Sequence, residues 1–333
     1  MSDDAAWAAA ASDGDLEAVL SAADDADLVM RTLPVRVTPA ARAVPDDTCE
    51  VTLLGALGCR YGMLSGGAGG LLVRTAGGAL IMDPGPAALT RLLKLAAEGE
   101  FDFAEVAGIV VTHLHPDHYA DLIPCLEGVA MASGRPPLVL VNPTAAERFA
   151  AFSPYHQSMG TWIVLAHPET EGDGEPCVKV TDMTVHATPA LHLEEAGRSH
   201  SAIGLVLETA AGHIWYSSDT NLWPGLLDAV AAIAPRPRLV IVHGDAALLH
   251  ADDERRAACH LGMRDLPVIA RQLAPEMLLV QHYDAAYSSS HYRQAHAEWV
   301  RRRTSGDVRV VPGYDGQRIV VSVSGSASVA VRG

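Results

Sequence analysis

A dense group of potential metal ligands follows one apolar run, and it constrains the fold more than any other feature of the sequence. The run is Ala107–Val111, which has the length and composition of a buried strand. Three histidines and one aspartate follow it within six residues: His113, His115, Asp117 and His118. Buried strands rarely end in such a cluster unless a cation is held there.

The spacing within the cluster predicts two metal positions. Residues at i and i+2 of a strand point the same way, so His113 and His115 can converge on one ion. Pro116 turns the chain, and we expect Asp117 and His118 on the first turn of a helix, facing a second ion. Neutral imidazole and carboxylate suit zinc, manganese or iron. A lone histidine here would more often be a solvated loop residue, whereas four ligand-type residues in this order favour metal binding.

Further potential ligands follow later predicted strands. They are His192, Asp219 and His282. Each alone is more often a capping residue, but together they complete two sites that share Asp219. The first site takes His113, His115, His192 and Asp219, and the second takes Asp117, His118, Asp219 and His282. Each ion would keep an open position, as a catalytic metal requires.

The order of predicted elements indicates an α/β fold with two sheets packed together and helices outside. Strands are predicted over residues 51–56, 71–75, 79–82, 107–111, 138–141, 178–188, 202–208, 213–217, 239–242, 277–280, 308–311 and 318–323. Helices are predicted over residues 86–97, 117–131, 223–233, 263–273 and 289–303, with another beginning near 143. Residues 55–70 hold seven glycines and are expected to be a loop, and residues 153–176 to be irregular.

The first part of the chain differs from the rest. Residues 1–48 are rich in alanine and carry ten acidic residues against three arginines. We expect an extension that includes a helix over about 16–23, serving either as a lid or dimer arm or as a partly ordered tail. Residues 49–333 are expected to form one catalytic domain.

Composition narrows the function classes. The formal net charge is −16, which disfavours a general nucleic-acid binder and leaves a small-molecule substrate. Five scattered cysteines without a paired motif are typical of reduced thiols in a cytoplasmic protein. We also expect no signal peptide and no membrane span.

In its motifs the chain resembles the metallo-β-lactamase-fold hydrolases. The turn at Asp83, the cluster at 113–118, His192, Asp219 and His282 match five motifs in order, over roughly residues 50–323. The resemblance implies a four-layer αββα sandwich with a dinuclear site at one edge of the sheets. It also implies that Asp83 orients the ligand loop without binding metal. His186 and His200 flank His192 and are alternatives for the third motif.

Within that superfamily, the C-terminal half is similar to the tRNase Z and phosphodiesterase-like branch. The similarity rests on a strand ending at His243, on His260 opening a helix, on the segment Leu279–Tyr287, and on Tyr314-Asp315-Gly316 before the last strand. It implies that His260 lies over the metals and donates a proton or hydrogen bond to the leaving group. His243 is expected behind the ligands.

The sequence departs from the tRNA-processing members in one respect. Residues 143–176, which would correspond to a tRNA-gripping arm, are short and acidic and contain one basic residue, Arg148. A nucleic-acid substrate is therefore not expected.

The hypothesis favoured by these patterns is a dinuclear hydrolase that uses a metal-bridging hydroxide on a small phosphodiester or related ester. Asp219 would bridge the ions, most simply zinc with manganese or iron as alternatives, and Asp117 would also orient the hydroxide. An alternative is a lactone, thioester or carboxylic ester hydrolase in which Tyr283 or Tyr287 polarises the carbonyl. A di-iron redox enzyme and a degenerate binding module are further alternatives, and a homodimer is compatible with the family.

Overall fold

The computed structural model describes residues 41–64, 68–193, 201–245, 260–284, 289–304 and 307–330. The helix predicted over 16–23 lies outside these residues. The strands of the described part are β1 (Thr48–Leu53), β2 (Leu71–Thr75), β3 (Gly78–Met82), β4 (Val106–Val111), β5 (Leu138–Val141), β6 (Thr161–Val164), β7 (Cys177–Val180), β8 (Met183–Pro189), β9 (Ile203–Thr209), β10 (Gly212–Tyr216), β11 (Leu239–Asp245), β12 (Leu261–Gly262), β13 (Met277–Gln281), β14 (Arg309–Pro312), β15 (Arg318–Ser322) and β16 (Gly325–Ala330).

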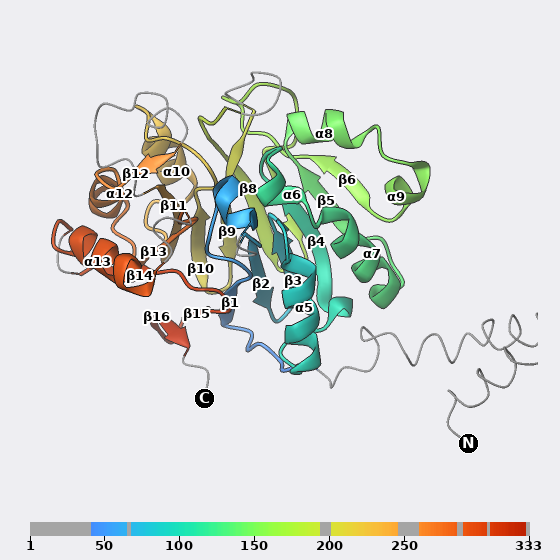
Figure 1. Ribbon diagram of the computed structural model, residues 1–333, viewed down its shortest axis with the longest axis horizontal. Coiled ribbons are helices and arrows are strands. Elements are labelled where there is room, and N and C mark those ends of the chain that lie inside the picture. Colours follow the sequence, from blue (N-terminus) through green and yellow to red (C-terminus); the bar gives the residue numbers. More distant parts are fainter. Residues whose placement is uncertain are drawn as a thin grey trace, which may run out of the picture.

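Helices connect these strands on the outside of the molecule (Figure 1). They are α4 (Cys59–Leu64), α5 (Ala88–Ala97), the 3-10 turn η1 (Phe103–Glu105), α6 (Pro116–Tyr119), α7 (Leu122–Ser133), α8 (Pro143–Phe149), α9 (Pro154–Ser158), α10 (Leu226–Ile233), α12 (Leu266–Leu273) and α13 (Ser290–Arg301).

The strands form two sheets. The first has the order β16-β15-β1-β2-β3-β4-β5-β6, and the second has the order β14-β13-β11-β10-β9-β8-β7 with β12 paired to β11. The strands from β3 to β6 are parallel, as are β10, β11, β13 and β14. Because β9 is antiparallel to both β8 and β10, these two run in the same direction. The carboxyl ends of β8, β10, β11 and β13 therefore lie at one edge of the second sheet.

Three apolar cores hold the layers together. One lies between the two sheets and includes Val51, Leu80, Leu205 and Ile241, all fully buried or nearly so. The second joins the first sheet to α5, α7 and α8, and the third joins the second sheet to α10, α12 and α13. In Figure 1, α5 and α7 lie on one side of the sheets and α12 and α13 on the other. The predicted four-layer αββα sandwich is confirmed.

Five local predictions were wrong. His260 was expected to open a helix, but β12 follows it directly and α12 begins only at Leu266. The glycine-rich segment contains the short helix α4, and the irregular segment contains α9 and β6. The predicted helix over 117–131 is two helices, because Asp121 donates its backbone N–H to the Pro84 carbonyl between α6 and α7. The predicted strand over 178–188 is the hairpin β7–β8, which turns at Thr181 with φ 56°. No glycine or proline marks that turn.

The described end of the N-terminal extension lies against the sandwich. The backbone N–H of Arg42 donates to the Gly99 carbonyl, and Arg74 donates to the Arg42 carbonyl at 2.7 Å. The Val44 side chain is buried. Strand β1 begins at Thr48, the last residue of the predicted extension. None of the helices in the described part of the chain is long and apolar enough to cross a membrane.

Candidate metal centre

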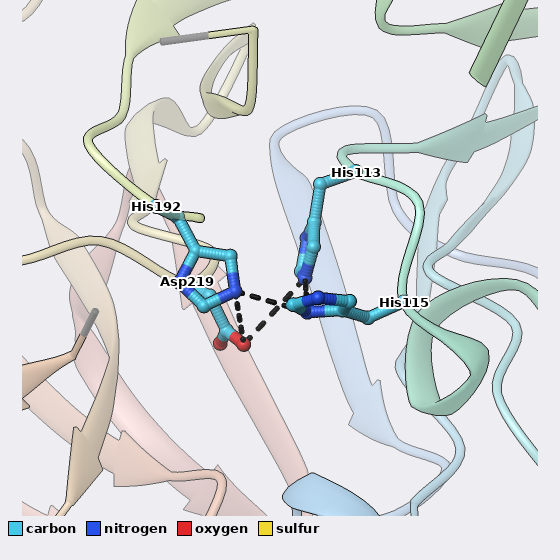
Figure 2. A group of neighbouring side chains, drawn as sticks. All are labelled: His113, His115, His192 and Asp219. Carbon is cyan, nitrogen blue, oxygen red and sulfur yellow. Dashed lines mark hydrogen bonds and ion pairs between the residues drawn. The ribbon is translucent and has the colours of Figure 1, made fainter. Parts of the chain in front are cut away.

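Among the described residues, four side chains from both sheets converge at the edge of the sandwich. They are His113 and His115 after β4, His192 after β8 and Asp219 after β10. Figure 2 shows His113 and His115 on one side, facing His192 and Asp219 on the other. The His115 Nδ1 lies 3.1 Å from His113 Nε2 and 3.0 Å from His192 Nε2. The Asp219 Oδ2 lies 3.6 Å from both of those Nε2 atoms. These four side chains are named the first group.

A second group shares Asp219. It adds His118 on α6 and His282 after β13. The His118 Nε2 lies 3.3 Å from His282 Nε2 and 3.5 Å from Asp219 Oδ2. Asp117 Oδ2 lies 3.2 Å from the His282 Nε2 and 3.6 Å from the His118 Nε2. The structure thus brings together every residue predicted as a metal ligand.

The spacing of these atoms fits a bound divalent cation. Four ligand atoms at zinc-bond lengths in a tetrahedron are about 3.3 Å apart. The separations given above range from 3.0 to 3.6 Å, and all four ligand atoms of the first group lie within 4.8 Å of one another. Nearly all of these side chains are buried, with His115 partly exposed. Buried imidazoles and carboxylates at this spacing are the donor set of a metal site.

Asp83 fixes the direction of His118. Its Oδ2 accepts a hydrogen bond from His118 Nδ1 at 2.9 Å, so the Nε2 of that ring points into the second group. The same carboxylate accepts from the backbone N–H and hydroxyl of Thr112 and from the Tyr216 hydroxyl at 2.8 Å. Asp83 has φ 48°, a backbone conformation that non-glycine residues rarely adopt. It lies behind the ligand, in the orienting position that the motif resemblance implies.

The first residue of α4 and the glycine before it support Asp117 and His282. The backbone N–H of Cys59 donates to Asp117 Oδ2 at 2.8 Å. Gly58 donates its N–H to the Tyr283 carbonyl, and a Cβ atom on Gly58 would overlap the His282 ring. Sequence reasoning missed this support, because the segment was expected to be a loop. Cys59 and His282 both have positive φ, and such strain concentrates at functional sites.

His243 lies in contact with the second group and could be counted as a ligand by proximity. However, both of its ring nitrogens already have polar neighbours. Nδ1 lies 2.6 Å from Asp219 Oδ1, and Nε2 lies 2.9 Å from Gln281 Nε2. This arrangement favours the predicted position behind the ligands over direct metal binding.

The carboxylates and imidazoles of the centre shift one another's pKa values. Burial raises the pKa of Asp219, but the surrounding imidazoles outweigh it and hold that pKa well below its ordinary value. The pKa of Asp117 is lowered in the same way by His118 and His282. Burial lowers the pKa of His118, yet three neighbouring carboxylates raise it well above the ordinary value. Burial, joined by neighbouring imidazoles, lowers the pKa of His113. The carboxylates are thus ionised ligands at neutral pH.

A cavity of about 350 Å³ opens beside the centre. His260 lines it, with its ring centroid 5.1 Å from that of His192 and 5.5 Å from that of His282. His260 Nδ1 lies 3.8 Å from Asp219 Oδ2. The other lining residues are Cys59, Met63, His115, Pro116, Asp117 and Asp219. His260 therefore faces the same space as residues of both groups.

Comparison with known proteins decides the family. Residues 79–283, more than half of the chain, match the family model described as the beta-lactamase superfamily domain. This chain belongs to the metallo-β-lactamase superfamily. It has the fold and the His/Asp cluster of a metal-dependent hydrolase. None of the curated proteins compared with the chain matches it.

Solved structures of this superfamily are similar in fold over most of this chain. The metallo-β-lactamase fold protein YhfI from Bacillus subtilis has a TM-score of 0.63 at 16% identity, over 82% of this chain and 99% of that one. The short form of human tRNase Z has a TM-score of 0.55 at 19% identity, over 82% and 99%. A diphosphatase from the PhnP family has a TM-score of 0.54 at 15% identity, over 81% and 96%. At these identities the likeness is one of fold.

In this superfamily member the structure also places His186, His296 and Tyr283. His186, an alternative for the third motif, pairs with Glu208 at 3.1 Å on the surface of the second sheet, while His200 lies outside the described residues. His296 lacks the spacing of a metal ligand in the sequence, which predicts a surface or loop position, but it is 1% exposed, so that prediction is wrong. Tyr283 is fully buried beneath Arg293, away from the cavity lining. Tyr287 lies outside the described residues.

Proposed function

We propose that this protein is a dinuclear metal-dependent phosphodiesterase acting on a small substrate. The observation that carries the proposal is the position of His260, over a cavity that reaches both ligand groups through their shared Asp219. Zinc is the ion we expect first, because its preferred ligands are those present, and manganese or iron suit the same donors.

The chain's own residues have distinct tasks in this proposal. Two divalent ions held by these groups would acidify a water and polarise the scissile bond. Asp117 lies on the cavity wall, where its carboxylate can accept a hydrogen bond and orient the attacking water. His260 lies on the same cavity and, when protonated, can donate to the leaving oxygen. Because His260 lines the cavity, it lies within reach of substrate as well as of Asp219.

The cavity supports a small substrate. Its volume of about 350 Å³ lies within the range of small-molecule pockets. Among the described residues that line it, none is lysine or arginine. The formal charge of −16 adds a long-range repulsion of nucleic acid. These features favour a small phosphodiester over tRNA, although the fold is shared with human tRNase Z.

Chemistry at phosphorus is favoured over carboxylic ester hydrolysis. Similar folds belong to a tRNase and a diphosphatase, whose names describe cleavage at phosphorus. The carboxylic ester hypothesis assigned carbonyl polarisation to Tyr283 or Tyr287. Tyr283 is buried against Arg293 and burial raises its pKa, so it is poorly placed for that role.

A substrate panel with a His260 variant tests the proposal. The zinc-loaded protein is offered a generic aryl phosphodiester, a lactone and a thioester. We expect turnover of the phosphodiester and a loss of about 100-fold to 10,000-fold in kcat for His260→Ala, because a positioned proton donor contributes that much. His156→Ala is the matched control, since His156 pairs with Glu127 at the surface. Full activity of His260→Ala, or turnover of only the lactone or thioester, would contradict the proposal.

A further inference from the structure

A buried chain of three side chains lies behind the second group. It runs from Gln281 at the end of β13, through His243 on β11, to Asp219 after β10. Each of the three residues is 2% exposed. The Gln281 Nε2 lies 2.9 Å from His243 Nε2, and the His243 Nδ1 lies 2.6 Å from Asp219 Oδ1. Gln281 was not among the residues predicted from the sequence.

The chemistry of these three groups permits one arrangement of hydrogens for a neutral His243. An ionised carboxylate can only accept, so the hydrogen of the imidazole must be on Nδ1, facing Asp219. Nε2 is then an acceptor, and the amide group of Gln281 must present its N–H, not its oxygen.

The amide oxygen supports this assignment. Within the described part of the structure, Gln281 Oε1 is buried and has no hydrogen-bond donor. Burying an amide oxygen without a donor is costly. The side chain is therefore held in an orientation in which its N–H has a hydrogen-bond partner and its oxygen has none. Such a cost is typical of positions where geometry is needed for function.

We infer that Gln281 is a positioning residue of the metal centre. Its amide N–H fixes His243 as the Nδ1–H tautomer, and His243 in turn holds Oδ1 of Asp219. The other oxygen of that carboxylate, Oδ2, is thereby left to His113 and His192 of the first group and to His118 of the second. His282 Nε2 lies 3.4 Å from Oδ1, the oxygen that His243 holds.

The positions around Asp219 agree with this division of its two oxygens. Oδ2 lies 3.6 Å from the His113 Nε2 of the first group and 3.5 Å from the His118 Nε2 of the second. The His243 ring stacks on the His282 ring with centroids 4.5 Å apart and planes at 14°. The backbone N–H of His243 also donates to Ser217 Oγ at 3.1 Å. The ring is thus fixed from its edge, its face and its backbone.

The tautomer of His243 can be measured directly. The full chain, labelled with ¹⁵N-histidine and loaded with zinc, is examined by long-range ¹H–¹⁵N correlation, and His243→Gln identifies the His243 signals by their loss. We expect a pyrrole-type Nδ1 and a pyridine-type Nε2. An Nε2–H tautomer, a doubly protonated ring or a metal-bound nitrogen on His243 would overturn the inference. This measurement needs no variant of Gln281 and no substrate.

Variants of Gln281 test its role in positioning. In Gln281→Glu the ionised side chain can only accept, so we expect His243 to carry a hydrogen on Nε2 in addition to the one on Nδ1, and zinc affinity to fall by about 10-fold to 100-fold. Gln281→Met removes the donor with little change in volume, and should weaken zinc binding by about 10-fold. Gln272→Glu is the matched control, because Gln272 lies on α12 and bonds Asp228 at the surface.

Zinc affinity is measured by competition with a chelator, so neither readout depends on turnover. Wild-type zinc affinity in both Gln281 variants, or a His243 ring with a hydrogen on Nδ1 alone in Gln281→Glu, would overturn the inference. The inference rests on the metal centre and not on the phosphodiester proposal, which fails or succeeds separately in the substrate panel.

Discussion

The two ligand groups share Asp219 but differ in how firmly their members are held. In the second group each ligand has a support that fixes its direction: Asp83 for His118, the Cys59 N–H for Asp117 and Gly58 for His282. The first group includes His115, which is only partly buried and lines the cavity, as Asp117 of the second group also does. The comparison indicates a firmly organised metal position beside a more adaptable one, with both positions facing the cavity. Ligands that are already held in the binding geometry raise metal affinity, so the second group should bind its ion more tightly than the first.

The largest expected effect is the loss of the second group through Gly58→Ala. The added Cβ would overlap the His282 ring and displace it. We expect zinc content to fall to about half of the wild-type value and activity to fall by at least ~100-fold, since small misplacements have such effects. Elemental analysis and turnover measure this. Gly325→Ala is the control, because its Cβ would meet open space. Full zinc content in Gly58→Ala would contradict the conclusion that Gly58 supports His282 and that the second group is the more firmly held.

A paired substitution compares the supports of the two groups. Asp83→Asn weakens the acceptor of His118 Nδ1, and we expect zinc binding to weaken by about 10-fold to 100-fold. Ser218→Ala removes a hydroxyl that lies 3.4 Å from His113 Nδ1 in the first group, and should weaken binding by less than about 10-fold. Titration calorimetry of both variants gives the order. A larger loss in Ser218→Ala would reverse the ranking of the two groups.

The smallest expected effect concerns a buried histidine outside the centre. Carboxylates raise the pKa of His118, whereas burial lowers the pKa of His296 to about 4. The unfolded chain therefore binds a proton at His296 between about pH 6.5 and 4 that the folded chain does not, and stability is lost as pH falls through this window. His296→Phe should lessen this loss by up to about 1.4 kcal/mol per pH unit.

Urea unfolding of wild type and His296→Phe across that window measures the difference. Because the ligand histidines titrate in both proteins, only the difference between the two curves is informative. Parallel curves would show that His296 is not the buried neutral group described here.

The sequence predicted those parts of the site in which ligand identity and strand position coincide. The cluster at 113–118 is local, and His192, Asp219 and His282 each follow a strand, so chemistry and position could be combined. Cys59 and Gly58 escaped prediction because they act through a backbone N–H and through the absence of a side chain. Gln281 escaped because its partner His243 comes from a neighbouring strand, and only the fold sets that pairing.

Other misses had a signal that could have been used. The buried residues of α13 are Arg293, His296, Ala297 and Val300. Their spacing marks one face of a helix, which would have placed His296 in the core. The break between α6 and α7 had no such signal, since it depends on a backbone contact with Pro84 from a distant turn. The cytoplasmic location, the homodimer and the identity of the metal stay predictions.

The origin of the ligands has a mechanical consequence. His113, His115 and His118 follow β4 of the first sheet, whereas His192, Asp219 and His282 follow strands of the second. Any ion bound by either group would thus cross-link one sheet to the other at their shared edge. Cation binding and association of the two sheets at this edge are then thermodynamically coupled. A change that separates the sheets there weakens both metal positions, and a bound ion stabilises the closed edge.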